Sequence, residues 1–368
     1  MKDDSLKTKA LLFIPDISGF TKFVNDTEVE HSGHIIRELL EIIINSNDLE
    51  LQVNEIEGDA VLFFRVGTPP DAARIAGQVR KMFMAFHKYL REIEALRICQ
   101  CGACTTAINL TLKFILHFGD ISVSNIGGYQ KLLGRDIIIA HRLMKNSAPD
   151  SEYLLITHNM ISMLEKASLE KAFNWAPINH GYTEYKHIGK IHYGYVLLTP
   201  LRSEVQADTL NTRVEKFPDP IVAEIFVAAP VRLIYETIVD LGKRPLWTEG
   251  LKTIDFNRND ILRIGSRHIC RLPSGLVELE TIHHRQKEGI IEYAERAVGS
   301  RLLPGASTLF QLKDHADGTT VRTEFHYKKR PVLGVIIDPI IRSRIEASLK
   351  KSSENLKNLC EEAVRKSS

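Results

Sequence analysis

A polar stretch containing several prolines, at residues 199–220, divides this sequence into two halves with different hydrophobic patterns. Before it, segments with the apolar spacing of strands and of helices alternate. After it, one strand and a short helix precede a series of strands and a long helix. Domain boundaries usually fall in such stretches, and 368 residues correspond to about two domains. We therefore predict an α+β protein with a first domain at 1–200, a linker at 201–217 and a second domain at 218–368.

The charge balance and the length of the apolar runs exclude two classes of partner. With 48 basic and 46 acidic residues, the chain has no net field that would attract nucleic acid or an anionic membrane. Its longest apolar runs, at 10–15 and 332–337, are much shorter than the roughly 20 residues of a membrane span. Asp3 and Asp4 stand where a signal peptide would be basic. We expect a cytoplasmic protein with no membrane span and no nucleic-acid partner.

Two aspartates carry the strongest chemical signal in the first domain. Asp16 ends a predicted strand in FIPDISGFT, and Asp59 lies in the turn of a predicted hairpin in EIEGDAVLFF. If the turn meets the strand end, the two carboxylates converge and can hold Mg²⁺ or Mn²⁺. The amides of Gly19, Phe20 and Thr21 would then wrap a polyphosphate, since glycine permits close backbone approach. The alternative is that Asp16 caps a helix and Asp59 is an ordinary turn residue.

Four segments of the first domain resemble, in the same order, the catalytic domain of class III nucleotidyl cyclases, over about residues 8–198. FIPDISGFT and EGDAVLFF are similar to the family's two metal-aspartate segments, and LKFILHFGDI to the strand that ends in His-x-Gly. LLGRDIIIAHRLMKNS is similar to the helix with the pattern Gly-x-x-Val-Asn-x-Ala-x-Arg-Leu. The resemblance implies a ferredoxin-like cyclase fold and a homodimer with active sites at its interface. It also implies a purine nucleoside triphosphate whose ribose 3′-oxygen attacks the α-phosphate and releases pyrophosphate.

The resemblance also assigns roles to individual residues. Asp16 and Asp59 would hold two Mg²⁺ or Mn²⁺ ions, with the carbonyl of Ile17 near one of them, and Arg142 would stabilise the transition state. Four positions before this arginine, Ile138 replaces the asparagine that orients the ribose in the family. Three outcomes stay open: a slow cyclase, a nucleotide-binding sensor without turnover, and a cyclase completed by a partner chain.

Other positions that resemble the family's nucleotide contacts are Glu55, Lys131 and Lys190. Glu55 stands where adenylate-specific members have a lysine, and Lys131 occupies the second base-reading position. A glutamate can accept hydrogen bonds from guanine, so the sequence suggests a preference for guanine. The equal alternative is a surface ion pair between Glu55 and Lys131. The family's triphosphate lysine falls near Lys190, although Ile188 is the other candidate for that position.

Three of the five cysteines, Cys99, Cys101 and Cys104, lie within ICQCGAC. Five is an odd number for a disulfide framework, so reduced thiols or a metal fit the cluster better. A zinc or iron ion would need a fourth ligand, for which His87, His117 or a cysteine of a second subunit are candidates. The alternative is a set of small thiols packed where a helix meets a sheet.

The second domain resembles the START-like helix-grip superfamily (SRPBCC), including its polyketide cyclase and dehydrase branch. The resemblance lies in AAPVRLIYETIVDLGKRPLWTEGLKTIDF, IGSRHICRLPSG and DGTTVRTEFHY. It implies a curved antiparallel sheet around a long C-terminal helix, with a pocket for a small hydrophobic ligand between them. We predict that Trp247, Cys270 and His283 line this pocket; the alternative for each is an outward-facing or core position.

Together the two halves predict a signalling protein in which a hydrophobic ligand in the second domain biases a nucleotide-dependent state of the first. A second reading is a catalytically silent interaction module joined to a carrier of a hydrophobic metabolite. Ile138 favours this second reading, whereas Asp16, Asp59 and Arg142 oppose it. A third reading makes the second domain an enzyme on an aromatic or polyketide substrate, but no acid–base pair is identifiable from spacing.

Overall fold

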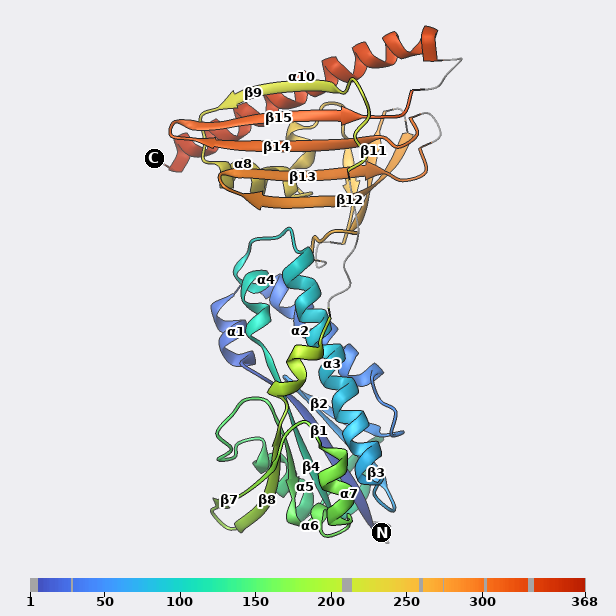
Figure 1. The fold of residues 1–368 in the computed structure, drawn as a ribbon, viewed down its shortest axis with the longest axis vertical. Helices are drawn as coiled ribbons and strands as arrows, with labels where there is room; N and C mark the ends of the chain where they lie inside the picture. The colour runs from blue at the N-terminus through green and yellow to red at the C-terminus, as the bar shows by residue number, and fades with distance from the viewer. Residues whose placement is uncertain are drawn as a thin grey trace. The chain divides into compact units, whose positions relative to one another are not determined.

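The structure, a computed structural model, describes residues 6–27, 29–206, 214–257, 261–273, 275–300, 303–329 and 334–367 (Figure 1). The chain forms two compact units: residues 1–95 with 101–207, and residues 96–100 with 208–368. Of the predicted linker, residues 207–213 lie outside the described ranges. Its first residues belong to a 3₁₀ helix, η2 (Thr199–Glu204), and Arg202 Nε donates to Glu152 Oε2 of the first unit at 2.6 Å. No helix among the described residues has the length and apolar character of a membrane span.

The first unit is built on a mixed sheet whose order is β2-β3-β1-β4-β6-β8-β7, with β5 paired to β4. The central strand β1 runs antiparallel to both β3 and β4, and β4 runs parallel to β6. The strands are β1 (Leu6–Ser18), β2 (Gln52–Glu57), β3 (Ala60–Val66), β4 (Thr111–Ile126), β5 (Tyr129–Leu133), β6 (Tyr153–Thr157), β7 (Ile178–Tyr185) and β8 (Gly189–Leu197).

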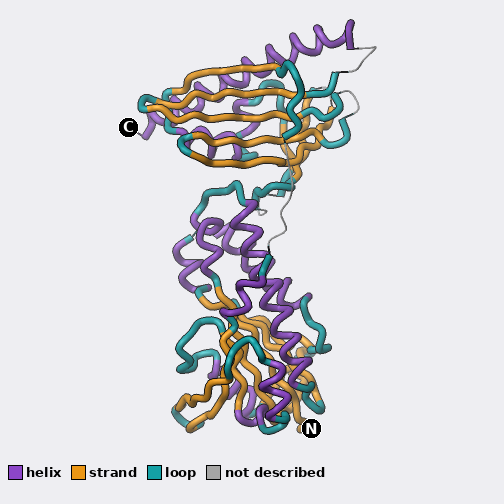
Figure 2. Tube along the Cα trace, viewed as in Figure 1, coloured by secondary structure: helices purple, strands orange, loops and turns teal. Residues whose placement is uncertain are grey.

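Helices connect these strands, as the alternation of apolar periods in the sequence predicts (Figure 2). The long helix α3 buries Ile75, Val79, Met82, Phe86 and Leu90, which recur at helical spacing. The helices are α1 (Phe20–Asp26), α2 (Val29–Asn45), α3 (Ala72–Leu96), α4 (Gly102–Thr106), η1 (Ala107–Asn109), α5 (Arg135–Leu143), α6 (His158–Ile161) and α7 (Lys166–Ala172).

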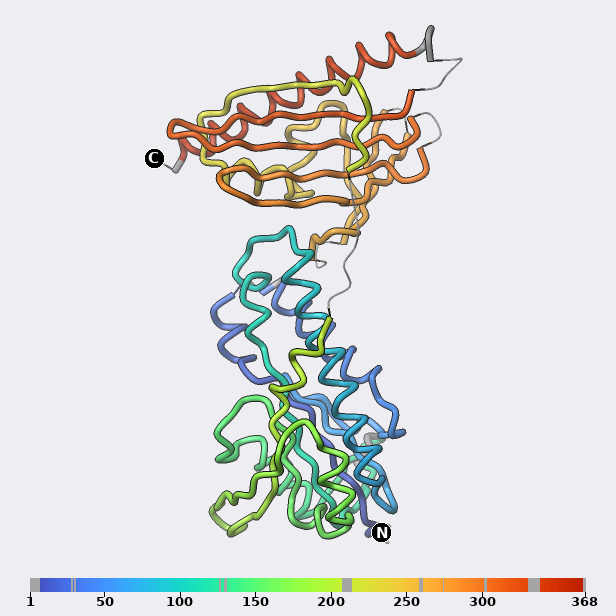
Figure 3. The backbone as a smooth tube through the Cα atoms, in the orientation of Figure 1, coloured from blue at the N-terminus to red at the C-terminus, as the bar shows by residue number. Residues whose placement is uncertain are grey.

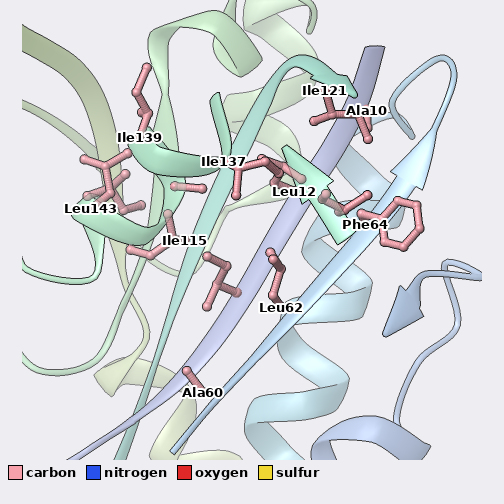
Figure 4. Packing of buried hydrophobic residues seen from close by; sticks show 14 of the residues in the cluster. Ala10, Leu12, Ala60, Leu62, Phe64, Ile115, Ile121, Ile137, Ile139 and Leu143 are labelled. Atoms are coloured by element: carbon pink, nitrogen blue, oxygen red, sulfur yellow. The ribbon is translucent and has the colours of Figure 1, made fainter. Parts of the chain in front are cut away.

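One face of the first sheet packs against α5. Leu12 of β1, Leu62 of β3 and Ile115 of β4 share a buried cluster with Ile137 and Leu143 of α5 (Figure 4). Burial of an apolar side chain of this size contributes about 1.5–3 kcal/mol. The cluster therefore holds α5 against the strands that carry the candidate metal ligands.

The second unit is a seven-stranded antiparallel sheet with the order β10-β11-β12-β13-β14-β15-β9. Strands β10 to β15 follow one another as neighbours, and β9 joins the far edge beside β15 (Figure 3). The strands are β9 (Ile221–Val227), β10 (Thr253–Asp255), β11 (Arg267–Leu272), β12 (Gly275–Lys287), β13 (Ile290–Ala297), β14 (Ser307–His315) and β15 (Gly318–His326). The helices are α8 (Val231–Val239), α9 (Arg244–Trp247) and α10 (Gly334–Ser367).

The core of the second unit joins the sheet to its helices. The rings of Trp247 and Tyr293 each lie 6.1 Å from the ring of Phe310, and Leu356 and Cys360 of α10 belong to the same buried cluster. The cluster also contains Ile98, from the segment 96–100 that follows α3. The whole chain is thus a mixed α+β protein, as predicted.

Candidate functional site

The end of β1 meets the β2–β3 turn. In the antiparallel ladder Asp16 pairs with Ala60, the residue after Asp59, and the Ile17 amide donates a hydrogen bond to the Asp59 carbonyl at 3.1 Å. Asp16 is buried and Asp59 half-buried. The register therefore brings the two aspartates to one corner of the sheet.

A lysine that the sequence analysis did not single out completes this corner. Lys113 of β4 pairs with Asp16 across the ladder, and its Nζ lies 3.0 Å from Asp16 Oδ2. Burial raises the pKa of Asp59, and the charge of Asp16 raises it further, while Lys113 acts in the opposite direction. The corner thus holds two carboxylates close enough to repel each other, partly neutralised by one ammonium group.

The turn after β1 is shaped by Gly19. Its φ of 90° lies in the left-handed region, which favours glycine, and its carbonyl accepts the Phe23 amide at 3.0 Å in the first turn of α1. A Cβ placed on Gly58 of the β2–β3 turn would lie 3.9 Å from the ring of Phe20. The two turns are therefore neighbours, and Thr21 is exposed beside them at the start of α1.

The two predicted base-reading residues face each other across β2 and β5. Lys131 Nζ lies 3.0 Å from Glu55 Oε2, and this hydrogen bond raises the pKa of Lys131. His141 of α5 adds a third group: its Nε2 lies 3.4 Å from Glu55 Oε1, and its Nδ1 lies 3.4 Å from Glu57 Oε2. The ion pair foreseen as the alternative is thus formed, and it includes a histidine that the sequence analysis missed.

The start of α5 is docked onto β4 through an aspartate. Asp136 accepts the Asp120 amide at 2.7 Å and lies 3.0 Å from His117 Nε2. Gly119 leaves the space that the Asp136 side chain fills, since a Cβ on this glycine would lie only 2.6 Å from Asp136 Cβ. The His-x-Gly pattern thus has a packing reason in this chain: it receives the helix that carries Arg142.

Gly119→Ala is expected to destabilise the first unit by about 1–3 kcal/mol, the usual cost of overpacking. The added methyl displaces Asp136 from the Asp120 amide and shifts α5. Urea unfolding followed by circular dichroism measures the loss. Gly77→Ala is the matched control, because Gly77 lies exposed in α3 with no atom within 4 Å of a new Cβ. It should be neutral or gain up to about 1 kcal/mol; equal behaviour of the two variants would contradict this account of Gly119.

Arg142 and Ile138 share the exposed face of α5, one helical turn apart. Ile138 is 53% exposed, so packing in this chain does not require an apolar side chain there. Arg142 is also exposed, and its carbonyl accepts the Tyr185 hydroxyl at 2.9 Å. Lys190, the predicted triphosphate lysine, lies on β8. Its Nζ is 4.9 Å from the centre of the Tyr182 ring.

The predicted cysteine cluster forms, but with a different histidine. The sulfurs of Cys101 and Cys104 lie 3.2 and 3.6 Å from Nδ1 of His31. The two histidines suggested as fourth ligands lie elsewhere: His87 Nε2 is 2.7 Å from Glu152 Oε1, and His117 Nε2 is 3.0 Å from Asp136 Oδ1.

The three predicted pocket residues of the second unit differ in their surroundings. Trp247 is buried, and the guanidinium carbon of Arg244 lies 5.7 Å from the centre of the Trp247 ring. Cys270 is also buried, and this burial raises the pKa of its thiol to about 11. His283 lies half-buried, with its Nε2 3.2 Å from Glu292 Oε2. A register shift between Thr281 and His283 interrupts the alternation of β12.

Four residues that shape these sites were assigned no role from the sequence: His31, Lys113, His141 and Arg244. Each acts through a contact with a residue distant in the sequence, which neither motif spacing nor periodicity records. Three of them lie within quoted motif segments: Lys113 in LKFILHFGDI, His141 next to Arg142, and Arg244 before Trp247, and only this proximity hinted at them.

Comparisons with known proteins give the following matches. A family model described as a protein of unknown function (DUF2652) matches residues 36–153. An uncharacterized protein of Mycobacterium tuberculosis is 27% identical over 159 residues, 43% of this chain and 71% of the relative. The adenylyl cyclase CyaB from P. aeruginosa is 17% identical, with 52% of this chain and 96% of that chain covered and a TM-score of 0.35. The guanylate cyclase domain of RhGC from Catenaria anguillulae, in complex with GTP, is 17% identical, with coverages of 52% and 97% and a TM-score of 0.37.

Proposed function

We propose that the first unit binds a purine nucleoside triphosphate with a divalent cation at Asp16 and Asp59, as a divergent nucleotidyl cyclase. One observation carries the proposal: the β1–β3 register brings these two aspartates, from separate motifs, to one corner of the sheet. The glycine turn at 19–21 lies beside this corner, where backbone amides can meet phosphate oxygens. The ordered resemblance of four segments to class III cyclases supports the same assignment.

The donor set of the corner fits a hard divalent cation. The charge of Asp16 raises the pKa of Asp59, so a cation that neutralises the two carboxylates would stabilise their charged forms. The Ile17 amide, next to Asp16 in the chain, is bonded to the Asp59 carbonyl. When bound, Mg²⁺ or Mn²⁺ would neutralise the triphosphate and lower the barrier to phosphoryl transfer. Asp16 and Asp59 would hold it, and Arg142 would place a positive charge near the leaving phosphates.

The Glu55–Lys131 pair supports a purine as the base. The carboxylate can accept and the ammonium can donate hydrogen bonds at one location, because the two groups are 3.0 Å apart. A preference for guanine follows if Glu55 turns from Lys131 to the base.

The exposed face of α5, with Ile138 and Arg142, supports a homodimer in which this face completes the site of the other subunit.

Lys113→Met tests the cation site directly. Because the Lys113 ammonium competes with a cation for Asp16, its removal is expected to strengthen Mn²⁺ binding by the full-length chain about tenfold. Isothermal titration calorimetry measures the change. Lys9→Met, which removes an exposed lysine elsewhere on β1, is the control and should leave the affinity unchanged. Weaker Mn²⁺ binding by Lys113→Met would contradict the proposed site.

A second candidate function is a silent cyclase-like interaction module. The contact between Lys113 and Asp16 favours it, since this ion pair satisfies Asp16 without a cation. The exposed Ile138, in place of a ribose-orienting asparagine, favours it as well. Nucleotide binding without any cyclic product would support a sensor, whereas no nucleotide binding at all would support the interaction module.

For the second unit we propose binding of a small hydrophobic molecule, in the manner of START-like helix-grip domains. The antiparallel sheet and the long helix α10 support this assignment. Trp247 packs in the buried core cluster, which is the alternative position for this residue. The coupling of such a ligand to the nucleotide state of the first unit, and the cytoplasmic location, stay predictions.

A further inference from the structure

Thiols from the ICQCGAC segment meet an imidazole from a distant helix. His31 lies in the first turn of α2, Cys101 immediately precedes α4, and Cys104 is buried within α4. His31 Nδ1 is 3.2 Å from Cys101 Sγ and 3.6 Å from Cys104 Sγ. Cys99, the third thiol of this segment, precedes Cys101 by two residues in the sequence.

These distances match those of a tetrahedral ion with sulfur and nitrogen ligands. Zn–S bonds of about 2.3 Å and Zn–N bonds of about 2.0 Å place a nitrogen and a sulfur ligand about 3.5 Å apart. The two N···S distances, 3.2 and 3.6 Å, lie on either side of this value. We propose that His31, Cys101 and Cys104 bind one Zn²⁺ ion in a structural site, with Cys99, two residues before Cys101 in the sequence, as the fourth ligand.

Hydrogen bonding alone accounts less well for this arrangement. Nδ1 of a neutral imidazole carries either one hydrogen or one lone pair, yet it lies close to two sulfurs at once. A central ion bonds the nitrogen and each sulfur separately. The Cys104 amide also points at Cys101 Sγ, at 3.5 Å, and such amide contacts orient a thiolate ligand and stabilise its charge.

The local fold gives the ion a structural role. Helix α4 has only five residues, and η1, which follows it, has three. Helices of this length are not stable alone, and the buried side chains here are small: Ala103, Cys104 and Ala107. An ion that links α4 to His31 of α2 would supply the stability that this segment lacks. None of its four ligands belongs to the nucleotide site proposed above.

Metal analysis of the full-length chain tests the proposal. Protein purified under reducing conditions and equilibrated with ZnCl₂ is expected to hold about one zinc per chain, measured by inductively coupled plasma mass spectrometry. Cys101→Ser and His31→Ala are each expected to weaken zinc binding at least 100-fold, roughly the upper end of the loss caused by removing an outer contact. Cys360→Ser is the matched control, because Cys360 is buried in the second unit, and it should keep its zinc.

Cobalt provides a readout that does not depend on the stability of the variants. Co²⁺ added to the wild-type chain should give the visible absorption of a tetrahedral, thiolate-bound ion, and Zn²⁺ should abolish it. This spectrum decides the question if circular dichroism shows that Cys101→Ser is unfolded. A folded wild-type chain without zinc, stoichiometric iron in its place, or undiminished zinc in folded Cys101→Ser would each overturn the proposal.

Discussion

Arg244→Met is expected to cost the second unit about 3–5 kcal/mol of folding free energy, because it leaves Glu295 charged and buried without its partner. Arg244 Nη1 lies 2.5 Å from Glu295 Oε2, and both side chains are buried. The Tyr293 hydroxyl donates to the other carboxylate oxygen at 2.5 Å, and Arg244 Nη2 donates to the Ile238 carbonyl at 3.1 Å. Methionine replaces the apolar stem of the arginine side chain but none of its hydrogen bonds.

Urea unfolding followed by tryptophan fluorescence isolates this effect. The chain has two tryptophans, one in each unit, so a Trp175→Phe background leaves Trp247 as the reporter of the second unit. The double variant Arg244→Met/Glu295→Leu should recover most of the loss, since an apolar pair of similar volume replaces a buried ion pair at little cost. A loss below about 1 kcal/mol in Arg244→Met, or a double variant less stable than either single one, would contradict this account.

The same pair predicts how the second unit responds to acid. Burial alone would raise the pKa of Glu295, but Arg244 and His268 outweigh it and hold this pKa below its usual range. A carboxyl whose pKa is lower in the folded chain stabilises the fold above the ordinary carboxyl range. That contribution is lost as the pH falls toward the folded-state pKa. Because Arg244 has the largest lowering effect on this pKa, Arg244→Met should by itself remove this part of the pH dependence.

Asp16→Asn is expected to weaken cation-dependent nucleotide binding by more than about 100-fold. Removal of an outer contact of a metal site typically costs 10- to 100-fold, and Asp16 is proposed as a direct ligand. The fold should tolerate the change, because the amide keeps the shape of the side chain and Lys113 remains bonded to the Met144 carbonyl. Fluorescent-nucleotide titration of the full-length chain, with and without Mn²⁺, measures the loss.

The control for this experiment is Asp26→Asn, which removes an exposed carboxylate at the end of α1. It should bind nucleotide as the wild type does. Nucleotide binding that survives in Asp16→Asn and still depends on Mn²⁺ would place the cation elsewhere; Glu55, Glu57 and His141, whose ligand atoms lie within 4.8 Å of one another, would then be the next group to test.

Periodicity predicted the regular elements of the fold well. Apolar residues recur at helical spacing in the sequence from 71 to 97, and this segment forms α3 (Ala72–Leu96). The predicted hairpin around Asp59 forms between β2 and β3. Periodicity did not reveal that residues 96–100 pack in the second unit, where the Tyr235 hydroxyl donates to the Ile98 carbonyl at 3.0 Å. That segment is too short for a periodic pattern, and its partners lie far along the chain.

In the candidate site, too, the sequence identified residues that stand in local motifs but missed residues that only the fold brings together. Asp16 and Asp59 were identified because each stands in a recognisable local motif at a strand end or turn. Lys113 and His31 were missed because their roles arise only from strand register and helix packing, which bring them to Asp16 and to Cys101. Ordinary surface positions for a lysine and a histidine give no distinguishing pattern in a single sequence.

The most direct test of the proposed function is turnover of ATP and GTP by the full-length chain with Mn²⁺ or Mg²⁺, with cyclic nucleotide and pyrophosphate both quantified. We expect cation-dependent nucleotide binding and slow formation of equal amounts of the two products, with GTP preferred, and no product from Asp59→Ala. Equal turnover of ATP and GTP would contradict the base-reading role proposed for Glu55, but it would not contradict the proposed cation site. The absence of both turnover and cation-dependent nucleotide binding in the folded wild-type chain would contradict the central claim.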